Sequence, residues 1–251
     1  MKPPLRIAML ECDTPLLKTR GKYGGYGGVF KALFEAGADA LNMPDVISSK
    51  KGMEITTWDV VNSELYPKLE NVDVVLLTGS KSNAFDNDPW ILKLVDFVKD
   101  VLAQDRIRII GVCFGHQILG RAMGVKVDRG SGWEISVCEI NLSAKGKELF
   151  KKDKLNLYQM HRDIVYGCPS DVEELGWSPT CSNQGMYVKG KVMTVQGHPE
   201  FTNPIETEIM EARHGQGIFD DATFEDGMKR VGSHHDGVAV AQAFIRFLLE
   251  D

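Results

Sequence analysis

The chain has 251 residues, of which 43% are hydrophobic and 25% are charged, and its formal net charge is −6. These values fit one α/β domain with a full hydrophobic core, and the negative charge argues against nucleic acid or an anionic membrane as a partner. No apolar stretch approaches the roughly 18 residues of a membrane helix, and the apolar run near the N-terminus is expected to be a strand and not a signal peptide. Five scattered cysteines without a C-x-x-C pair predict a reducing, cytoplasmic location and neither a disulfide framework nor a structural metal.

Short apolar runs alternate with amphipathic segments in the first half of the chain. Three runs are predicted to be strands buried on both faces: 5–10, 72–79 and 106–113. Two amphipathic segments are predicted to be crossover helices: 28–39 and 88–104. The second of these begins with Asp88 as the expected N-cap and Pro89 at the first helical position. The glycine-rich segment 21–28 fits neither phosphate-binding pattern and is predicted to be a flexible loop that borders the active site.

The second half of the chain is richer in strand-like runs. Strands are predicted at 133–142, 154–160 and 191–198, and closing helices at 203–214 and 237–251. The lysine-rich segment 143–154 is interrupted by acidic residues and is expected to be a solvated face. The segment 233–237 lacks a third ligand at a recognised metal spacing and is expected to cap the last helix. No repeat or linker divides the chain, which predicts one doubly wound domain with a mixed sheet.

The segment G-V-C-F-G at 111–115 places a cysteine between two glycines, where a predicted strand ends and a helical pattern begins. This is the cysteine form of the nucleophile elbow, a strained corner that requires neighbours without Cβ atoms. The corner lifts the Cys113 side chain above the carboxyl end of the sheet, at a helix N-terminus that favours a thiolate. The Phe114 N–H would face an oxyanion. A small buried hydrophobic residue at a tight turn is the alternative interpretation of Cys113.

A nucleophilic cysteine needs a base, and the base needs an orienting group. The segment 198–200 supplies both, because residues two apart in an extended segment project to the same side. His198 is therefore the predicted base and Glu200 the group that sets its tautomer, with a surface histidine as the alternative. The turn that begins at Gly79 is predicted to supply the second oxyanion N–H, with an ordinary β-turn as the alternative.

Three motifs together resemble the class I glutamine amidotransferase superfamily, and they occur in its order: T-G-S-K at 78–81, G-V-C-F-G-H-Q-I-L-G-R-A-M-G at 111–124 and Q-G-H-P-E-F at 196–201. The resemblance covers a core of about residues 5–215, and 216–251 would be a C-terminal helical extension of a single domain spanning 1–251. It implies a flavodoxin-like, doubly wound, mostly parallel sheet with helices on both faces and a small additional antiparallel sheet.

The resemblance also implies roles for particular residues. Cys113, His198 and Glu200 would form a triad that attacks the γ-carbonyl of a glutamine or γ-glutamyl group. The backbone amides of Gly79 and Phe114 would form the oxyanion hole. Gln117 and Ser80 would bind the substrate, with Gln117 recognising its amino-acid end.

Within the superfamily the chain is most similar to stand-alone members, particularly plant γ-glutamyl peptidases. Four segments carry this likeness: 23–30, 82–94, 113–117 and 158–165. The M-H-R-D segment is also similar to one that lines the glutamine pocket in GMP synthetase glutaminase domains. It makes His161 and Asp163 candidates to hold an α-amino or α-carboxylate group, with a strand end and polar turn as the alternative.

The chain departs from the superfamily pattern at three positions. Ser80 and Lys81 stand where many amidotransferases have glycine and proline, and Phe114 stands where they commonly have leucine. These changes leave the chemistry in place and weaken the case for glutamine itself as the substrate.

The prediction is therefore a cysteine-dependent hydrolase of γ-glutamyl amide bonds, which acts through a γ-glutamyl thioester and needs no cofactor. Its substrate would be a small molecule: glutathione, a glutathione conjugate or glutamine. One alternative is a glutaminase subunit that supplies ammonia to a synthetase partner; without an S-G-G-x-D-S nucleotide loop, this chain alone would not be a complete GMP synthetase. Another alternative is a catalytically silent binding or regulatory protein.

Overall fold

A seven-stranded sheet forms the centre of the protein, which is described by a computed structural model over residues 1–250. The strand order is β2-β1-β3-β4-β10-β9-β7; β2, β1, β3, β4 and β10 are parallel, and β9 and β7 pair antiparallel at one edge. The strands are β1 (Leu5–Glu11), β2 (Met53–Asp59), β3 (Val74–Leu77), β4 (Arg108–Val112), β7 (Glu173–Glu174), β9 (Met186–Val188) and β10 (Val192–Val195).

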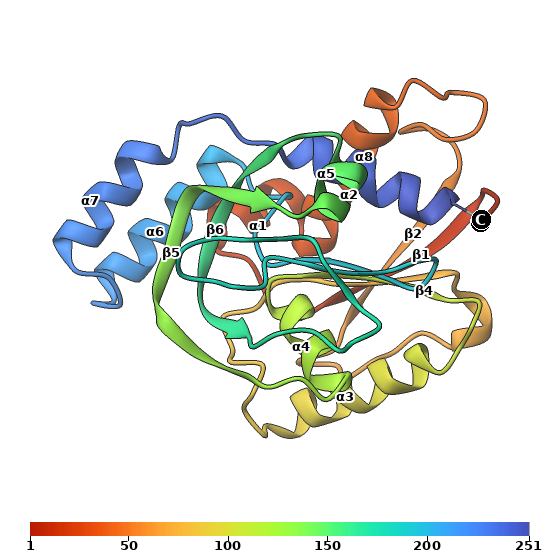
Figure 1. The fold of residues 1–251 in the computed structure, drawn as a ribbon, viewed down its shortest axis with the longest axis horizontal. Helices are drawn as coiled ribbons and strands as arrows, with labels where there is room; N and C mark the ends of the chain where they lie inside the picture. The colour runs from red at the N-terminus through yellow and green to blue at the C-terminus, as the bar shows by residue number, and fades with distance from the viewer. Residues whose placement is uncertain (251) are drawn as a thin grey trace.

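Helices cover both faces of this sheet (Figure 1). On one face lie α2 (Tyr26–Ala40), α5 (Ala144–Phe150) and α8 (Gly237–Leu249); on the other lie α3 (Pro89–Leu102) and α4 (Phe114–Ala122). Each face has its own hydrophobic core, because buried strands present apolar side chains in both directions. Parallel strands with helices on both faces confirm the predicted doubly wound, flavodoxin-like α/β fold. None of the helices in residues 1–250 is long and apolar enough to cross a membrane.

A separate antiparallel ribbon lies beside the main sheet. It consists of β5 (Val127–Leu142) and β6 (Lys154–Val165), and β8 (Gly176–Trp177) pairs with its edge. Its inner face packs against α6 (Asn203–Gly215) and α7 (Asp221–Arg230), which lie at the far left of Figure 1, in a third hydrophobic core. The predicted small antiparallel sheet is therefore confirmed. α1 (Leu17–Tyr23) contacts α6 from the other side.

The predicted strands and helices all appear, but β5 begins at Val127 and not at 133, and β6 extends to Val165 and not only to 160. The predicted end of the last helix, at 251, lies outside the described residues. Asp88 does stand at the N-cap of α3 with Pro89 next to it, although its side chain makes no capping hydrogen bond. Strand β2 was not predicted. Its residues alternate between half-buried and exposed at the edge of the sheet, and such a strand has no long apolar run to reveal it.

The prediction of a flexible loop at 21–28 is wrong. The segment contains the end of α1 and the first turn of α2, and Glu11 accepts a hydrogen bond from the Gly27 N–H at 2.7 Å. A Cβ atom on Gly27 would lie 2.2 Å from the Thr57 Cγ2 atom, and one on Gly28 would lie 2.0 Å from the Tyr23 carbonyl oxygen. Gly27 therefore allows α2 to pack closely on β2, and Gly28 allows it to pack closely on the end of α1.

The segments 143–154 and 233–237 have structural roles. Lys145, Lys147 and Lys154 pair with acidic residues on the surface, as expected of a solvated face. Asp236 occupies the N-cap position of α8, but its side chain does not cap that helix. It accepts a hydrogen bond from the Asn156 N–H at 2.9 Å and pairs with Lys152 at 2.9 Å, so it anchors the helix to the ribbon.

Candidate active site

Cys113 occupies the corner between β4 and α4. Its backbone has φ 52° and ψ −106°, a conformation that is strained for a residue with a side chain. A Cβ atom on Gly111 would lie 2.7 Å from the Gly115 carbonyl oxygen, and one on Gly115 would lie 2.5 Å from the Leu77 carbonyl oxygen. The corner therefore requires glycine on both sides, as the sequence pattern indicated. It is held by a 3.0 Å hydrogen bond from the Cys113 N–H to the Val195 carbonyl oxygen.

The histidine and glutamate come from the loop after β10. His198 Nδ1 lies 2.8 Å from Glu200 Oε1, and both residues are only 4% exposed. The imidazole also stacks on the Phe201 ring, with centroids 3.9 Å apart and planes 10° apart. Because Glu200 occupies Nδ1, Nε2 is the nitrogen left to hydrogen-bond Cys113. The structure thus brings the three predicted triad residues together.

The charges around His198 determine its protonation state. Burial lowers the pKa of the imidazole, but the Cys113 sulfur and the Glu200 carboxylate outweigh burial and raise the pKa to about 10. The imidazole is therefore protonated at neutral pH, opposite the Cys113 sulfur. A thiolate–imidazolium pair combines a nucleophile with a proton donor for the leaving group.

The turn after β3 lies against this pair. A Cβ atom on Gly79 would lie 2.7 Å from His198 Cε1 and 3.6 Å from Cys113 Cβ. The preceding residue, Thr78, holds the turn in place, because its hydroxyl accepts the Cys12 N–H at 2.9 Å. Phe114 begins α4, where backbone amides have no acceptor within the helix. Both predicted oxyanion-hole residues therefore adjoin the cysteine.

A cavity of about 550 Å³ opens over these residues. Ser80, Gln117, His161 and Asp163, the predicted substrate-binding residues, all line it. Gln117 donates from Nε2 to the Asp163 carbonyl oxygen at 2.9 Å, which connects α4 to the end of the ribbon. Burial raises the pKa of the Asp163 carboxyl, and the nearby Arg129, at 3.3 Å, partly counteracts this effect. Asp163 thus gives the part of the cavity near the end of β6 a carboxyl group.

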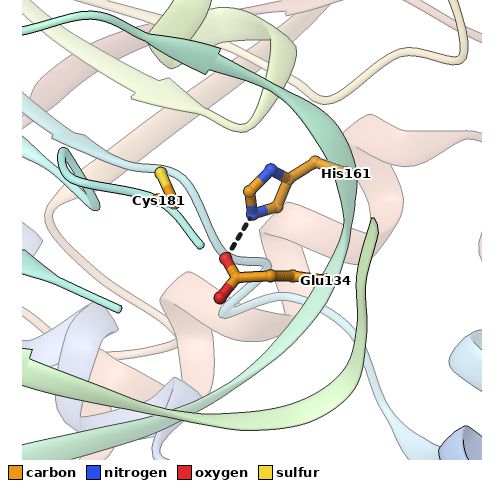
Figure 2. A group of neighbouring side chains, drawn as sticks. All are labelled: Glu134, His161 and Cys181. Atoms are coloured by element: carbon orange, nitrogen blue, oxygen red, sulfur yellow. Dashed lines mark ion pairs between the residues drawn. The ribbon is translucent and has the colours of Figure 1, made fainter. Parts of the chain in front are cut away.

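His161 belongs to a buried cluster with Glu134 and Cys181 (Figure 2). Its Nε2 atom lies 2.9 Å from Glu134 Oε2, without good hydrogen-bond alignment, and its Nδ1 atom lies 3.1 Å from the Asp163 carbonyl oxygen. Glu134 also accepts a hydrogen bond from Gln184 at 2.8 Å. The ring of His161 is therefore oriented by protein groups on both of its nitrogens.

The same cluster has the residue types of a metal site, with its three donor atoms within 4.8 Å of one another. Each of these groups also has a partner in the protein. Burial raises the pKa of the Cys181 thiol to about 12, and its Sγ atom donates a 3.2 Å hydrogen bond to the Asn183 carbonyl oxygen. Glu134 accepts from Gln184, and His161 Nδ1 contacts the Asp163 carbonyl oxygen, so the cluster supports the cavity wall.

The sequence analysis missed part of the cavity wall. Tyr26, Trp133, Arg162 and Arg213 line it from four different elements. Arg213 lies on a helix that was predicted correctly, but nothing in its spacing distinguishes it from a solvated surface arginine. Only the packing of α6 against the ribbon turns it toward the cavity.

Comparison with known proteins identifies the family. Residues 45–214 match the family model of the class-I glutamine amidotransferases. A glutamine amidotransferase-like protein of Schizosaccharomyces pombe is 34% identical over 250 residues, which cover 97% of this chain and 98% of that protein. Gamma-glutamyl peptidase 2 of Arabidopsis thaliana is 30% identical over 220 residues, covering 83% of this chain and 81% of that protein.

The fold is shared with solved structures as well. A crystal structure of a glutamine amidotransferase from Thermotoga maritima superposes with a TM-score of 0.69 and covers 98% of this chain and 99% of that chain, at 18% identity. At that identity the likeness concerns the fold. Together with the sequence matches, it shows that this chain belongs to the class I glutamine amidotransferase family.

Proposed function

We propose that the protein is a cytoplasmic cysteine hydrolase that cleaves γ-glutamyl amide bonds in small γ-glutamyl peptides. The observation that carries this proposal is the arrangement of His198 between Cys113 and Glu200, with an imidazole pKa raised to about 10 against the opposing effect of burial. The cavity over the sulfur has room for a small peptide. We further propose that residues 1–251 form a single domain, because α8 shares a hydrophobic core with α2 and β1.

The acylation half of the reaction uses the ion pair. The Cys113 thiolate attacks the γ-carbonyl carbon, and the Gly79 and Phe114 amides donate hydrogen bonds to the resulting oxyanion. The His198 imidazolium then gives its proton to the departing nitrogen. The C–N bond breaks, a free amine leaves, and a γ-glutamyl thioester remains on the sulfur.

Deacylation reverses the proton flow. Neutral His198 takes a proton from water, and the hydroxide equivalent attacks the thioester carbonyl. The C–S bond breaks, glutamate is released, and the thiolate–imidazolium pair is restored. Glu200 keeps the imidazole in one orientation throughout, as the 2.8 Å contact at Nδ1 requires.

Recognition of the γ-glutamyl group is assigned to the end of the cavity near Asp163. The Asp163 carboxylate suits an α-ammonium group, and so does Gln117 Oε1, because Gln117 Nε2 already donates to Asp163 and Gln196. The Ser80 hydroxyl is a donor for the α-carboxylate. His161 positions this end, because its Nδ1 atom contacts the Asp163 carbonyl oxygen. The similarity to a γ-glutamyl peptidase over 83% of the chain supports this substrate class.

The test incubates purified protein with glutathione, a glutathione S-conjugate and glutamine, beside Cys113→Ala. Release of glutamate from the γ-glutamyl peptides by the wild type, and none by Cys113→Ala, is expected. Hydroxylamine added during turnover should divert the thioester to γ-glutamyl hydroxamate. Turnover that survives in Cys113→Ala, or none of any γ-glutamyl compound in the wild type, would overturn the proposal.

Family membership supports a second candidate: a glutaminase subunit that supplies ammonia to a synthetase. It predicts that glutamine is turned over only when a partner protein is added and that γ-glutamyl peptides are poor substrates. The same incubation separates the two functions, because a stand-alone peptidase needs no partner.

A further inference from the structure

Two arginines lie over the ring of Trp133 on the cavity wall. The Arg162 guanidinium carbon is 5.0 Å from the ring centroid, and that of Arg213 is 5.1 Å from it. Phe219 contacts the same indole edge-on, with centroids 5.1 Å apart. The three cavity-lining residues come from β5, β6 and α6, so the ribbon and the helix jointly build this feature.

These two arginines lack an ion-pair partner in the described part of the chain. Within residues 1–250, neither guanidinium forms an ion pair with a carboxylate, and their contacts are to the aromatic ring. Arg213 is partly buried beside the cavity, and its charge acts on Cys113 and Glu206 without pairing with either. Withdrawing an unpaired guanidinium from water is unfavourable, and this cost applies to Arg213, because Arg162 is exposed. An anion supplied by a ligand would offset the cost at Arg213 and would have Arg162 as a second cationic partner.

This cationic wall is separate from the end assigned to the γ-glutamyl group. Arg162 lies between His161 and Asp163 on β6, and consecutive residues of a strand point to opposite sides. Asp163 is therefore expected to contact one part of a bound substrate, and Arg162 and Arg213 are expected to contact another part. An ammonium group suits the first and a carboxylate the second, since guanidinium binds carboxylate through two parallel hydrogen bonds.

We propose that Arg162 and Arg213, held by Trp133, bind a carboxylate on the leaving amine of the substrate. This inference rests on the proposed hydrolase function and specifies its substrate class: γ-glutamyl amides of amino acids or peptides with a free carboxyl end. Glutamine lacks such a group, because its leaving group is ammonia. The hydrolysis itself is unchanged; the amine that departs carries the carboxylate.

The test compares γ-glutamylglycine with γ-glutamylglycinamide, which differ only in that carboxylate. The wild type should hydrolyse the acid with a kcat/KM about 10- to 100-fold above that of the amide. Arg162→Met combined with Arg213→Met keeps the apolar stems on Trp133 and should remove this preference. Arg20→Met, an exposed arginine on α1 outside the cavity, should retain it. Equal rates for acid and amide in the wild type would overturn the inference.

A comparison with glutamine as substrate shows which carboxylate the two arginines bind. The double variant should lose more activity toward γ-glutamylglycine than toward glutamine. An equal loss on both would mean that the arginines hold the α-carboxylate of the glutamyl group, which contradicts the inference.

Binding to Cys113→Ala separates this inference from the proposed function. If the wild type cleaves no γ-glutamyl compound, the hydrolase proposal fails, and calorimetry with the two dipeptides still tests the wall. Tighter binding of the acid than of the amide supports the carboxylate site, and equal binding overturns it.

Discussion

Removing the charge of Glu200 isolates its contribution to His198. Glu200→Gln keeps the size and shape of a side chain whose Oε1 atom lies 2.8 Å from the imidazole, with the two side chains 1% and 5% exposed. Burial lowers the pKa of His198, while Cys113 and Glu200 raise it to about 10. The substitution removes one of the two groups that overcome burial.

The expected size of the effect follows from this geometry. An opposite charge at 2.8 Å shifts a pKa by about 1–3 units. Solvent screens a buried pair weakly, so we expect a shift of ~2–3 units, which corresponds to ~3–4 kcal/mol. Since the folded pKa of His198 is raised, its imidazolium exists below that pKa and is lost as pH rises through it. The alkaline limb of kcat/KM should therefore move down by about 2 units. We also expect kcat at neutral pH to fall roughly 100-fold. This loss is smaller than the ~10⁴-fold loss that follows when the aspartate of a serine triad is replaced by asparagine, because a thiol ionises more readily than a hydroxyl.

The assay is kcat/KM for a γ-glutamyl peptide as a function of pH. Glu208→Gln is the matched control, because Glu208 is a buried carboxylate on α6 that does not contact His198. It accepts hydrogen bonds from the Lys18 and Thr19 amides instead, at 2.7 and 2.9 Å. It should keep the wild-type alkaline limb. An alkaline limb in Glu200→Gln within about 0.5 units of the wild type would refute the assigned role of the carboxylate.

Three further substitutions test the packing and the charges around the site. Gly79→Ala places a Cβ atom 2.7 Å from His198 Cε1 and should lower kcat about 10- to 100-fold in steady-state kinetics, because the imidazole must move. Gly115→Ala places a Cβ atom 2.5 Å from the Leu77 carbonyl oxygen and should lower the free energy of unfolding in urea by about 2–4 kcal/mol, since backbone cannot yield cheaply. Burial raises the pKa of Glu206 from 4.5 to about 7. The folded state therefore loses stability as pH rises through this interval, because the buried carboxyl must ionise. Glu206→Gln should be up to about 3 kcal/mol more stable than the wild type at alkaline pH and equally stable in acid.

Each of these outcomes has a control or a contrary result. Gly21→Ala adds a Cβ atom with nothing within 4 Å, inside helix α1; it should leave kcat unchanged and should raise the unfolding midpoint slightly, because alanine is the better helix former. An unchanged kcat in Gly79→Ala, or an unchanged midpoint in Gly115→Ala, would contradict the steric argument. If Glu206→Gln kept the full pH dependence of wild-type stability, another group would be responsible for it.

The parts of the site that sequence reasoning predicted are local in the chain. Gly111, Cys113 and Gly115 lie within five residues, and the steric demands of the corner are visible in that spacing alone. The same holds for His198 and Glu200, because an extended segment places residues two apart on one side. Apolar runs buried on both faces likewise indicated the parallel strands and so the doubly wound fold.

Two predictions from the sequence failed for the same reason. The glycines at 21–28 looked like a flexible segment, but their role depends on Glu11 and Thr57, which approach from other elements. Strand β2 lacked an apolar run because it is an edge strand. For Gly27 and for β2, the deciding neighbours belong to other elements, which the local pattern does not reveal.

The sequence by itself determined which residues carry the chemistry and how each is presented on its own segment. The tertiary structure alone decided which segments come together. Strand β10 pairs with β4, and the Val195 carbonyl oxygen accepts a hydrogen bond from the Cys113 N–H. This pairing places His198, which follows β10, within hydrogen-bond distance of the Cys113 sulfur. It also decided that Trp133 gathers Arg162 and Arg213 onto one cavity wall. Backbone conformation follows from neighbours along the chain, whereas charge pairing, burial and pKa depend on neighbours in space.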